Sequence, residues 1–288
     1  MLREDRMTSR ARTAGDEGAR LHWYYEVATV LVFYVVYSVV RNSFGSSSVR
    51  PDQALDNALR VIDVERALGL FFEPHLQDTF IGWGWFLRLW NIFYSSLHFV
   101  VTGGVMIFLY RRYPGRYRVM RTTLGFTTGL ALLGFSLFPL MPPRLLNDFG
   151  VYGGRSLEFD FVDTLAQVGG LWSFNSDAMQ TVSNQYAAMP SLHIGWSLWC
   201  VLAVWPVLTS RWARRAFAVY PAITLFAIVV TANHFWLDAV GGAVVLLVGW
   251  RLAVRFEVVA LRFRSSRRAG GGTAGSSDDE LDANACAA

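Results

Sequence analysis

Two histidines and one aspartate are the residues of this chain whose types and spacing could do chemistry. His193 follows Pro190-Ser191-Leu192 at the start of one apolar stretch, and His234 stands four residues before Asp238 at the start of another. Ionisable side chains are costly to keep at the edge of hydrocarbon, so their position beside expected helix starts favours a chemical role. We therefore expect these three residues to form one reactive site.

The spacing of these residues indicates how the reaction would proceed. Residues four apart share a helix face, so Asp238 is expected to accept a hydrogen bond from one imidazole nitrogen of His234. The other nitrogen stays free and basic, which makes His234 a candidate nucleophile. His193 lies in a first helical turn, where unpaired amides attract phosphate, and its imidazole could protonate a departing oxygen. The pattern predicts phosphoryl transfer through a phosphohistidine, with no metal ion and no cofactor.

Arg144 and Ser191 are the expected phosphate-binding residues. The guanidinium of Arg144 offers a bidentate fork, and Pro142 and Pro143 before it stiffen its approach. Ser191 belongs to the helix start that precedes His193. The alternative for Arg144 is an anchor at the membrane interface.

Three further polar residues, Asn91, Tyr94 and His98, are spaced by three and four and are expected on one helix face. They could contact a polyol headgroup or support the catalytic histidines. The alternative is a polar seam that joins helices. Glu65 and Glu73 could shape a headgroup pocket, but we expect them on the solvated face of an amphipathic helix.

The composition indicates a membrane protein, because 53% of the residues are hydrophobic and long apolar stretches recur. The chain has no lysine, which excludes a Walker-type phosphate loop and a Schiff-base mechanism. Its two cysteines, Cys200 and Cys286, exclude a cysteine metal quartet and a disulfide framework. The net charge of +4 comes from arginine blocks beside apolar stretches, so we expect the lipid bilayer as partner and no nucleic acid.

The expected fold is all-α, a polytopic helical bundle with about six transmembrane helices. An amphipathic helix lying in the membrane interface is expected from Pro51 to about Glu73, with Gly69 near its end. Residues 1–22 are expected to be a polar cytoplasmic tail, 23–256 the catalytic membrane domain, 141–190 an extracytoplasmic cap loop, and 257–288 a disordered cytoplasmic tail. The six crossings are expected at 24–40, 83–110, 122–140, 191–208, 216–230 and 236–254.

Orientation follows from the arginine blocks at 3–20, 111–121, 211–215 and 251–268. With six crossings all four blocks fall on one side, which the positive-inside rule makes cytoplasmic. Both termini of this cell-membrane protein are then cytoplasmic. His193, His234, Asp238 and Arg144 lie together at the extracytoplasmic side.

The motifs Pro190-Ser191-x-His193 and His234-x-x-x-Asp238 resemble the second and third signatures of the type 2 phosphatidic acid phosphatase superfamily, over about residues 60–250. The resemblance implies that His234 takes the phosphoryl group, that Asp238 orients it and that His193 is the acid for the leaving group. It further implies a membrane lipid phosphate as substrate.

Two departures from the phosphatase pattern resemble one branch of that superfamily. Ala227-Ile228 stand where the phosphatases usually carry Ser-Arg, and Pro143-Arg144 reverses the usual order of the first signature. The stretches 65–69 (Glu-Arg-Ala-Leu-Gly) and 91–98 also look like bacterial relatives of inositol phosphorylceramide synthase. This branch implies an inositol phosphotransferase-like reaction, with a polyol or lipid hydroxyl as acceptor; a lipid or polyprenyl phosphate phosphatase is the alternative.

Functions of other classes stay open at this point. In a transporter, buried His and Asp would relay protons or contact substrate, but the polar residues here gather at one face and not at the membrane midplane. A non-enzymatic scaffold would not need both histidine motifs. Haem ligation by His98 with His193 or His234 has no supporting motif.

Overall fold

The computed structural model describes residues 49–147, 159–170 and 185–271, together with scattered helical positions between Tyr24 and Ser38. Regular structure within these ranges is helical, and the one extended pairing they contain is a parallel bridge between Leu140 and Ala187. The all-α fold class is therefore confirmed for the part of the chain that is described. The residues of the expected first crossing and of the cap loop lie partly outside it.

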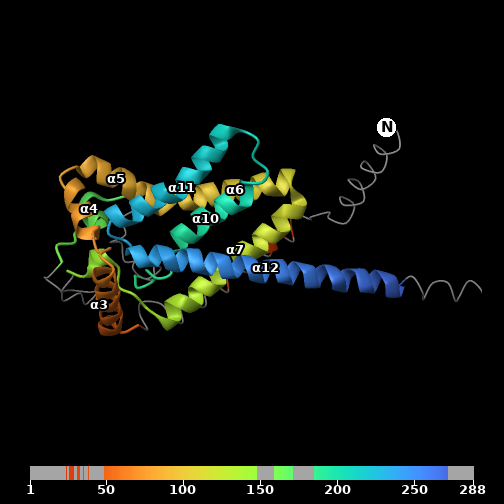
Figure 1. Ribbon diagram of the computed structural model, residues 1–288, viewed down its shortest axis with the longest axis horizontal. Coiled ribbons are helices and arrows are strands. Elements are labelled where there is room, and N and C mark those ends of the chain that lie inside the picture. Colours follow the sequence, from red (N-terminus) through yellow and green to blue (C-terminus); the bar gives the residue numbers. More distant parts are fainter. Residues whose placement is uncertain are drawn as a thin grey trace, which may run out of the picture.

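Helices of unequal length form an elongated bundle, with α3 and α4 at one end and the second half of α12 extending from the other (Figure 1). In chain order they are α3 (Pro51–Ala67), α4 (Glu73–Phe80), α5 (Gly84–Ile92), the π-helix η1 (Phe93–Leu97), α6 (His98–Arg112), α7 (Pro114–Leu137), the 3-10 helix η2 (Pro143–Leu145), α8 (Thr164–Val168), α10 (Leu192–Val204), α11 (Arg211–Val230) and α12 (Trp236–Gly271).

Two stretches of the described chain are long and apolar enough to cross a membrane by length and composition. One is the continuous helical run Gly84–Arg112, formed by α5, η1 and α6, and the other is α11. A third apolar helix, α10, has 13 residues, or about 20 Å at the rise of an α-helix, which is shorter than a hydrocarbon core. The expectation of six crossings stays a prediction.

Glycines bring α12 against its neighbours at several levels. A Cβ placed on Gly242 would meet the Ser191 carbonyl oxygen at 2.3 Å, and one on Gly249 would meet the Thr127 hydroxyl at 2.7 Å. Helix backbones approach this closely only where small residues line the contact, as membrane helices commonly arrange. The start of α10 is therefore fixed by its contact with α12.

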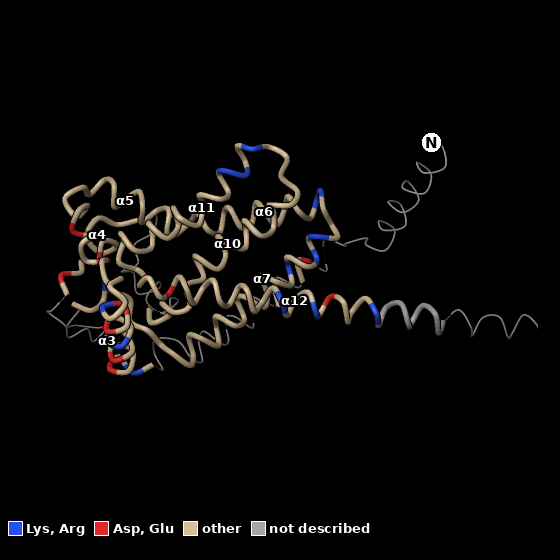
Figure 2. Tube along the Cα trace, in the orientation of Figure 1, with Lys and Arg blue, Asp and Glu red and all other residues tan. Residues whose placement is uncertain are grey.

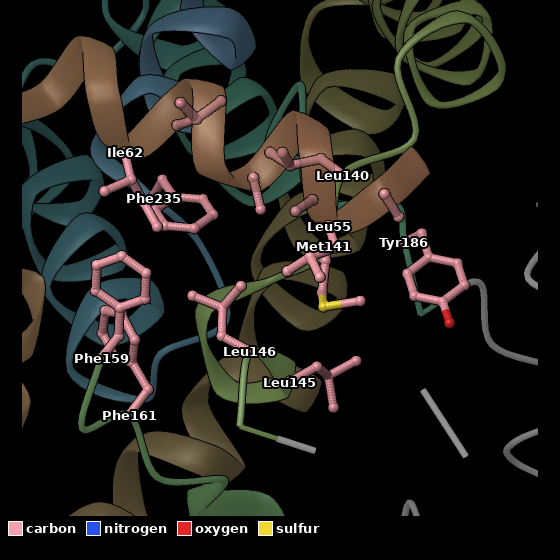
Figure 3. Packing of buried hydrophobic residues seen from close by; sticks show 14 of the residues in the cluster. Leu55, Ile62, Leu140, Met141, Leu145, Leu146, Phe159, Phe161, Tyr186 and Phe235 are labelled. Atoms are coloured by element: carbon pink, nitrogen blue, oxygen red, sulfur yellow. The ribbon is translucent and has the colours of Figure 1, made fainter. Parts of the chain in front are cut away.

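The helix α3 is part of the packed core. Its apolar face meets the segment after α7 and the start of α12; Figure 3 shows Leu55 and Ile62 beside Met141, Leu146 and Phe235. The Asn57 amide donates to the Pro139 carbonyl at 2.9 Å, and Met141 N donates to Ala54 O at 3.1 Å. The amphipathic helix is thus confirmed and ends near Gly69 as expected, at a backbone φ of 68° that suits glycine.

Arginines gather toward one end of the bundle. Figure 2 shows those of the α6–α7 junction, of the start of α11 and of α12 on the side away from α3 and α4. Glu26, inside the expected first crossing, pairs with Arg121 at 2.5 Å and accepts from the Tyr117 hydroxyl at 2.9 Å. The arrangement agrees with the segregation that the positive-inside rule requires; the side of the membrane stays a prediction.

The expected start of a disordered tail at residue 257 is wrong, because α12 continues to Gly271. Glu257 accepts a hydrogen bond from the Thr122 hydroxyl at 2.7 Å, which ties this part of α12 to α7. Residues 272–288 lie outside the described part.

Replacing Gly242 by alanine should separate α10 from α12, because the added Cβ overlaps the Ser191 carbonyl. We expect a loss of about 1–3 kcal/mol of stability, as for other overpacked contacts, measured as a lower midpoint of thermal unfolding in detergent. Gly129→Ala is the matched control, since a Cβ there has nothing within 4 Å. Equal midpoints for both variants would contradict the close contact.

Candidate active site

His234 and Asp238 form the pair that their spacing predicts. Nδ1 of His234 lies 3.1 Å from Oδ2 of Asp238, and both side chains are buried. A carboxylate only accepts, so Nδ1 carries the hydrogen and Nε2 of His234 keeps its lone pair. Asp238 Oδ2 also accepts a hydrogen bond from the backbone amide of Phe235, at 2.9 Å. The carboxylate thus orients the ring from a rigid position at the start of α12.

Hydrogen bonds in the turn before His234 fix the backbone conformation of that residue. The amides of Asn233 and His234 both donate to the Ile228 carbonyl, at 3.0 and 3.2 Å. Ala232 has a φ of 53°, a left-handed conformation that is unfavourable for a residue other than glycine. The Ala232 carbonyl accepts from the Arg144 amide at 2.8 Å, so η2 is attached to this same turn.

His193 lies beside His234, with ring centroids 5.4 Å apart in an edge-on arrangement. It stacks on Tyr94 at 4.3 Å and contacts the His98 ring at 4.3 Å. His193 Nε2 lies 3.2 Å and His98 Nδ1 lies 3.0 Å from the same carbonyl oxygen, that of Tyr94. A carbonyl oxygen accepts, so each of these nitrogens carries a hydrogen, and His193 Nδ1 is left as the basic atom.

The π-helix η1 explains why the expected set of Asn91, Tyr94 and His98 does not stay together. The wide turn over Phe93–Leu97 adds a residue and changes the phase between α5 and α6. Tyr94 and His98 consequently contact His193. Asn91 points elsewhere: its amide nitrogen donates to the carbonyls of Thr164 and Gly169, at 3.0 and 2.9 Å.

The first turn of α10 leaves backbone amides without an acceptor among the described residues. Among the described residues, the amides of Leu192, His193 and Ile194 donate no hydrogen bond, as is usual for a first helical turn. Ser191 is fully buried and its hydroxyl has no partner, while its amide donates to the Asp238 carbonyl at 2.9 Å. Unpaired amides and a free hydroxyl beside two imidazoles fit a phosphate group.

Arg144 is held by the segment that follows it. Its Nη1 lies 2.7 Å from Oδ2 of Asp163, and its Nη2 donates to the Gln185 side chain, whereas its buried Nε has no partner. The Arg144 amide donates to the Ala232 carbonyl, two residues before His234, so the backbone of Arg144 lies close to the turn that carries the nucleophile. Two of the three guanidinium nitrogens of Arg144 therefore bind protein acceptors, and Nε is without a partner among the described residues.

Two glutamates complete the site, and their expected place on a solvated face is wrong. Glu65 and Glu73 are fully buried. Glu73 Oε1 accepts from the amide of Trp236 at 3.1 Å, and Glu65 Oε1 accepts from that of Leu237 at 2.9 Å. The reason is the packing of α3 and α4 against the start of α12, where unpaired helix amides attract carboxylates.

Some site residues could not be recognised from the sequence. Asp163 and Gln185 belong to the long segment after α7. This segment is rich in acids and amides, but its composition does not indicate which of them contact the site. For Glu65 a signal existed, since it opens the stretch Glu-Arg-Ala-Leu-Gly. No three His, Cys, Asp or Glu side chains of the described residues are placed to hold a metal ion.

Comparison with known proteins gives one result. A family model described as the PAP2 superfamily matches residues 59–252, about two thirds of the chain. Searches of curated proteins and of solved structures give no significant match. The matched range contains every residue of the site described above.

Asn91→Leu should destabilise the protein, because it removes the donor for two carbonyls and the acceptor for the Thr164 hydroxyl. Unsatisfied buried groups cost about 1–3 kcal/mol each. We expect a lower thermal midpoint and an unchanged KM at a permissive temperature. A raised KM with an unchanged midpoint would instead support substrate contact by Asn91.

Proposed function

The chain belongs to the PAP2 superfamily, and from that premise we propose that it is an integral membrane phosphotransferase acting on lipid phosphate esters. The observation that carries the proposal is the His234–Asp238 pair at 3.1 Å with His193 beside it. An oriented nucleophilic nitrogen next to a second imidazole suits a double displacement at phosphorus. The proposed reaction needs no metal ion.

In the first half of the reaction, the lone pair on Nε2 of His234 attacks phosphorus, and the bond from phosphorus to the leaving oxygen breaks. His193 enters this step as the imidazolium, with Nδ1 also protonated, gives that oxygen its Nδ1 proton and is left neutral, with Nδ1 basic. The open amides of α10, the Ser191 hydroxyl and Arg144 would hold the non-bridging oxygens, where negative charge increases in the transition state. Asp238 stabilises the positive charge that His234 acquires.

In the second half, His193 is the base. It takes the proton of an acceptor hydroxyl, whose oxygen attacks phosphorus while the bond to His234 breaks. A polyol or a lipid hydroxyl would make the protein a transferase, and water would make it a phosphatase. Both outcomes use the same residues, so they differ in how the acceptor reaches the phosphohistidine.

One position favours transfer over hydrolysis. Ile228 stands where the phosphatases of the superfamily usually carry arginine, and its side chain is fully buried beside Ile194 and Val229. Its carbonyl holds the His234 amide. An aliphatic side chain there removes a charged, hydrated group from the neighbourhood of the nucleophile, so we propose an inositol phosphotransferase-like reaction.

The proposed setting is the cell membrane, with both termini cytoplasmic and the site facing the extracytoplasmic side. The site lies at the end of the bundle opposite most arginines in Figure 2, and this separation supports the orientation. The described segments 159–170 and 185–190 hold Arg144 and Asn91. We propose that the 141–190 segment shapes the entry of substrate.

The test is turnover by purified protein in lipid nanodiscs, without added metal, on phosphate-labelled lipid phosphates and phosphodiesters with and without a polyol acceptor. His234→Ala should abolish turnover, and His193→Gln should lower kcat by about 10²–10⁴-fold. His75→Gln is the matched control, because the His75 side chain is exposed and belongs to none of the contacts of the site described above. It should keep full activity.

Label appearing on the acceptor supports the transferase, and free labelled phosphate assigns the alternative phosphatase. Equal turnover in His234→Ala and the parent protein would overturn the histidine mechanism. Label trapped on the protein in an acid-labile bond, absent from His234→Ala, would identify the phosphohistidine.

A further inference from the structure

Glu65 and Glu73 come from different helices and meet at the start of α12. One oxygen of each carboxyl group binds an α12 amide, as described above. The other oxygen of each, Oε2 in both residues, is buried and receives no hydrogen bond from any group in the part of the chain that the structure describes. Because the amides that they bind, those of Trp236 and Leu237, are consecutive in the chain, the two carboxyl groups are brought close together.

Two buried carboxylates side by side lack any donor between them. Ionised carboxyl groups only accept hydrogen bonds, so two of them would leave both outer oxygens unsatisfied and bring two negative charges together. A single proton held by the pair lets one carboxyl group donate to the other and removes one charge. The remaining charge still favours the amide end of α12.

We propose that Glu65 and Glu73 share one proton and act as a pair of positioning residues that hold the start of α12, and with it His234. The inference rests on the proposed function for its catalytic consequence, but the shared proton itself does not. Phe235, Trp236 and Leu237 follow His234 directly, so a displacement of their amides would move the nucleophile.

The surroundings support a protonated pair. Burial raises the pKa of Glu65 to about 9, and the neighbouring Glu73 carboxylate adds to the rise. Asp238 raises the pKa of Glu65 further, whereas the Leu237 amide lowers it. Of the other ionisable groups around the pair, His234 is hydrogen-bonded to Asp238, and Arg66 packs over Phe71 and Phe159 at 5.3 and 5.0 Å.

Because the pKa of Glu65 is raised in the folded protein, the stability of the protein depends on pH. An acid whose pKa is higher in the folded protein keeps its proton there while the unfolded chain has lost it. The contribution of Glu65 to the free energy of unfolding therefore falls as pH rises from about 4.5 toward about 9, and is constant above it. Above about pH 9 the pair carries two charges, whose repulsion separates the carboxyl groups and displaces the α12 amides bound to them.

The first experiment is the infrared spectrum of the nanodisc protein at neutral pH. The difference between parent and Glu65→Gln should contain the carbonyl stretch of a protonated carboxyl group, and so should the difference between parent and Glu73→Gln. Asp63→Asn, on the exposed side of α3, is the control and should show no such band. This readout needs no substrate, so it is independent of the proposed reaction.

The second experiment is the pH profile of turnover. In the parent, kcat should fall about tenfold for each pH unit above about 9, with KM nearly constant. In Glu65→Gln the alkaline fall should disappear, because a glutamine amide supplies the hydrogen and cannot ionise. Thermal midpoints should likewise depend less on pH in Glu65→Gln than in the parent.

Absence of the protonated-carboxyl band in both difference spectra would overturn the shared proton. If the protonated-carboxyl band is present but kcat of Glu65→Gln falls at alkaline pH as it does in the parent, the positioning role would be overturned. If the parent shows no turnover but the band is present, the shared proton stands and the proposed function fails.

Discussion

The structure depends on how the first turn of α12 is satisfied. Three consecutive amides, from Phe235 to Leu237, would be costly to bury without acceptors, and each meets a carboxylate: Asp238, Glu73 and Glu65 in turn. These carboxylates come from α12 itself, from α4 and from α3. The same contacts therefore join three helices and hold the backbone that carries His234. Fold and site share one set of hydrogen bonds.

A second constraint is the close approach of helices around that point. Gly242 allows the start of α10 to lie against α12, where the Ser191 amide meets the Asp238 carbonyl. His193 is brought beside His234 by this contact, and the π-helix η1 brings the Tyr94 carbonyl to His193. The reacting groups are thus held by backbone contacts, and few mobile side chains are needed for their orientation.

Much of the fold was predictable from the sequence, because apolar length and helical periodicity are local properties. The helices α3, α7, α10 and α11 overlap the apolar and amphipathic stretches that predict them, although some boundaries differ, most of all at the start of α7, which begins at Pro114 and not at 122. The end of α12 was not predictable, since Glu257 finds a partner in the Thr122 hydroxyl of another helix. The phase change at η1 also had no local signal, because its effect is seen only in the contacts of Asn91 and His98.

The sequence by itself predicted the reactive pair from the four-residue spacing of His234 and Asp238. In the structure, His234 lies in the turn just before α12 and contacts Asp238 in the first turn of that helix. The sequence also predicted a membrane protein, through the length of its apolar stretches, and its lack of lysine excluded two classes of lysine-dependent chemistry. Only the tertiary structure decided that Glu65 and Glu73 are buried against α12, and that Asp163 and Gln185 hold Arg144. The physical reason is that burial and pairing of a charge depend on which distant segment packs over it, and composition does not carry that information.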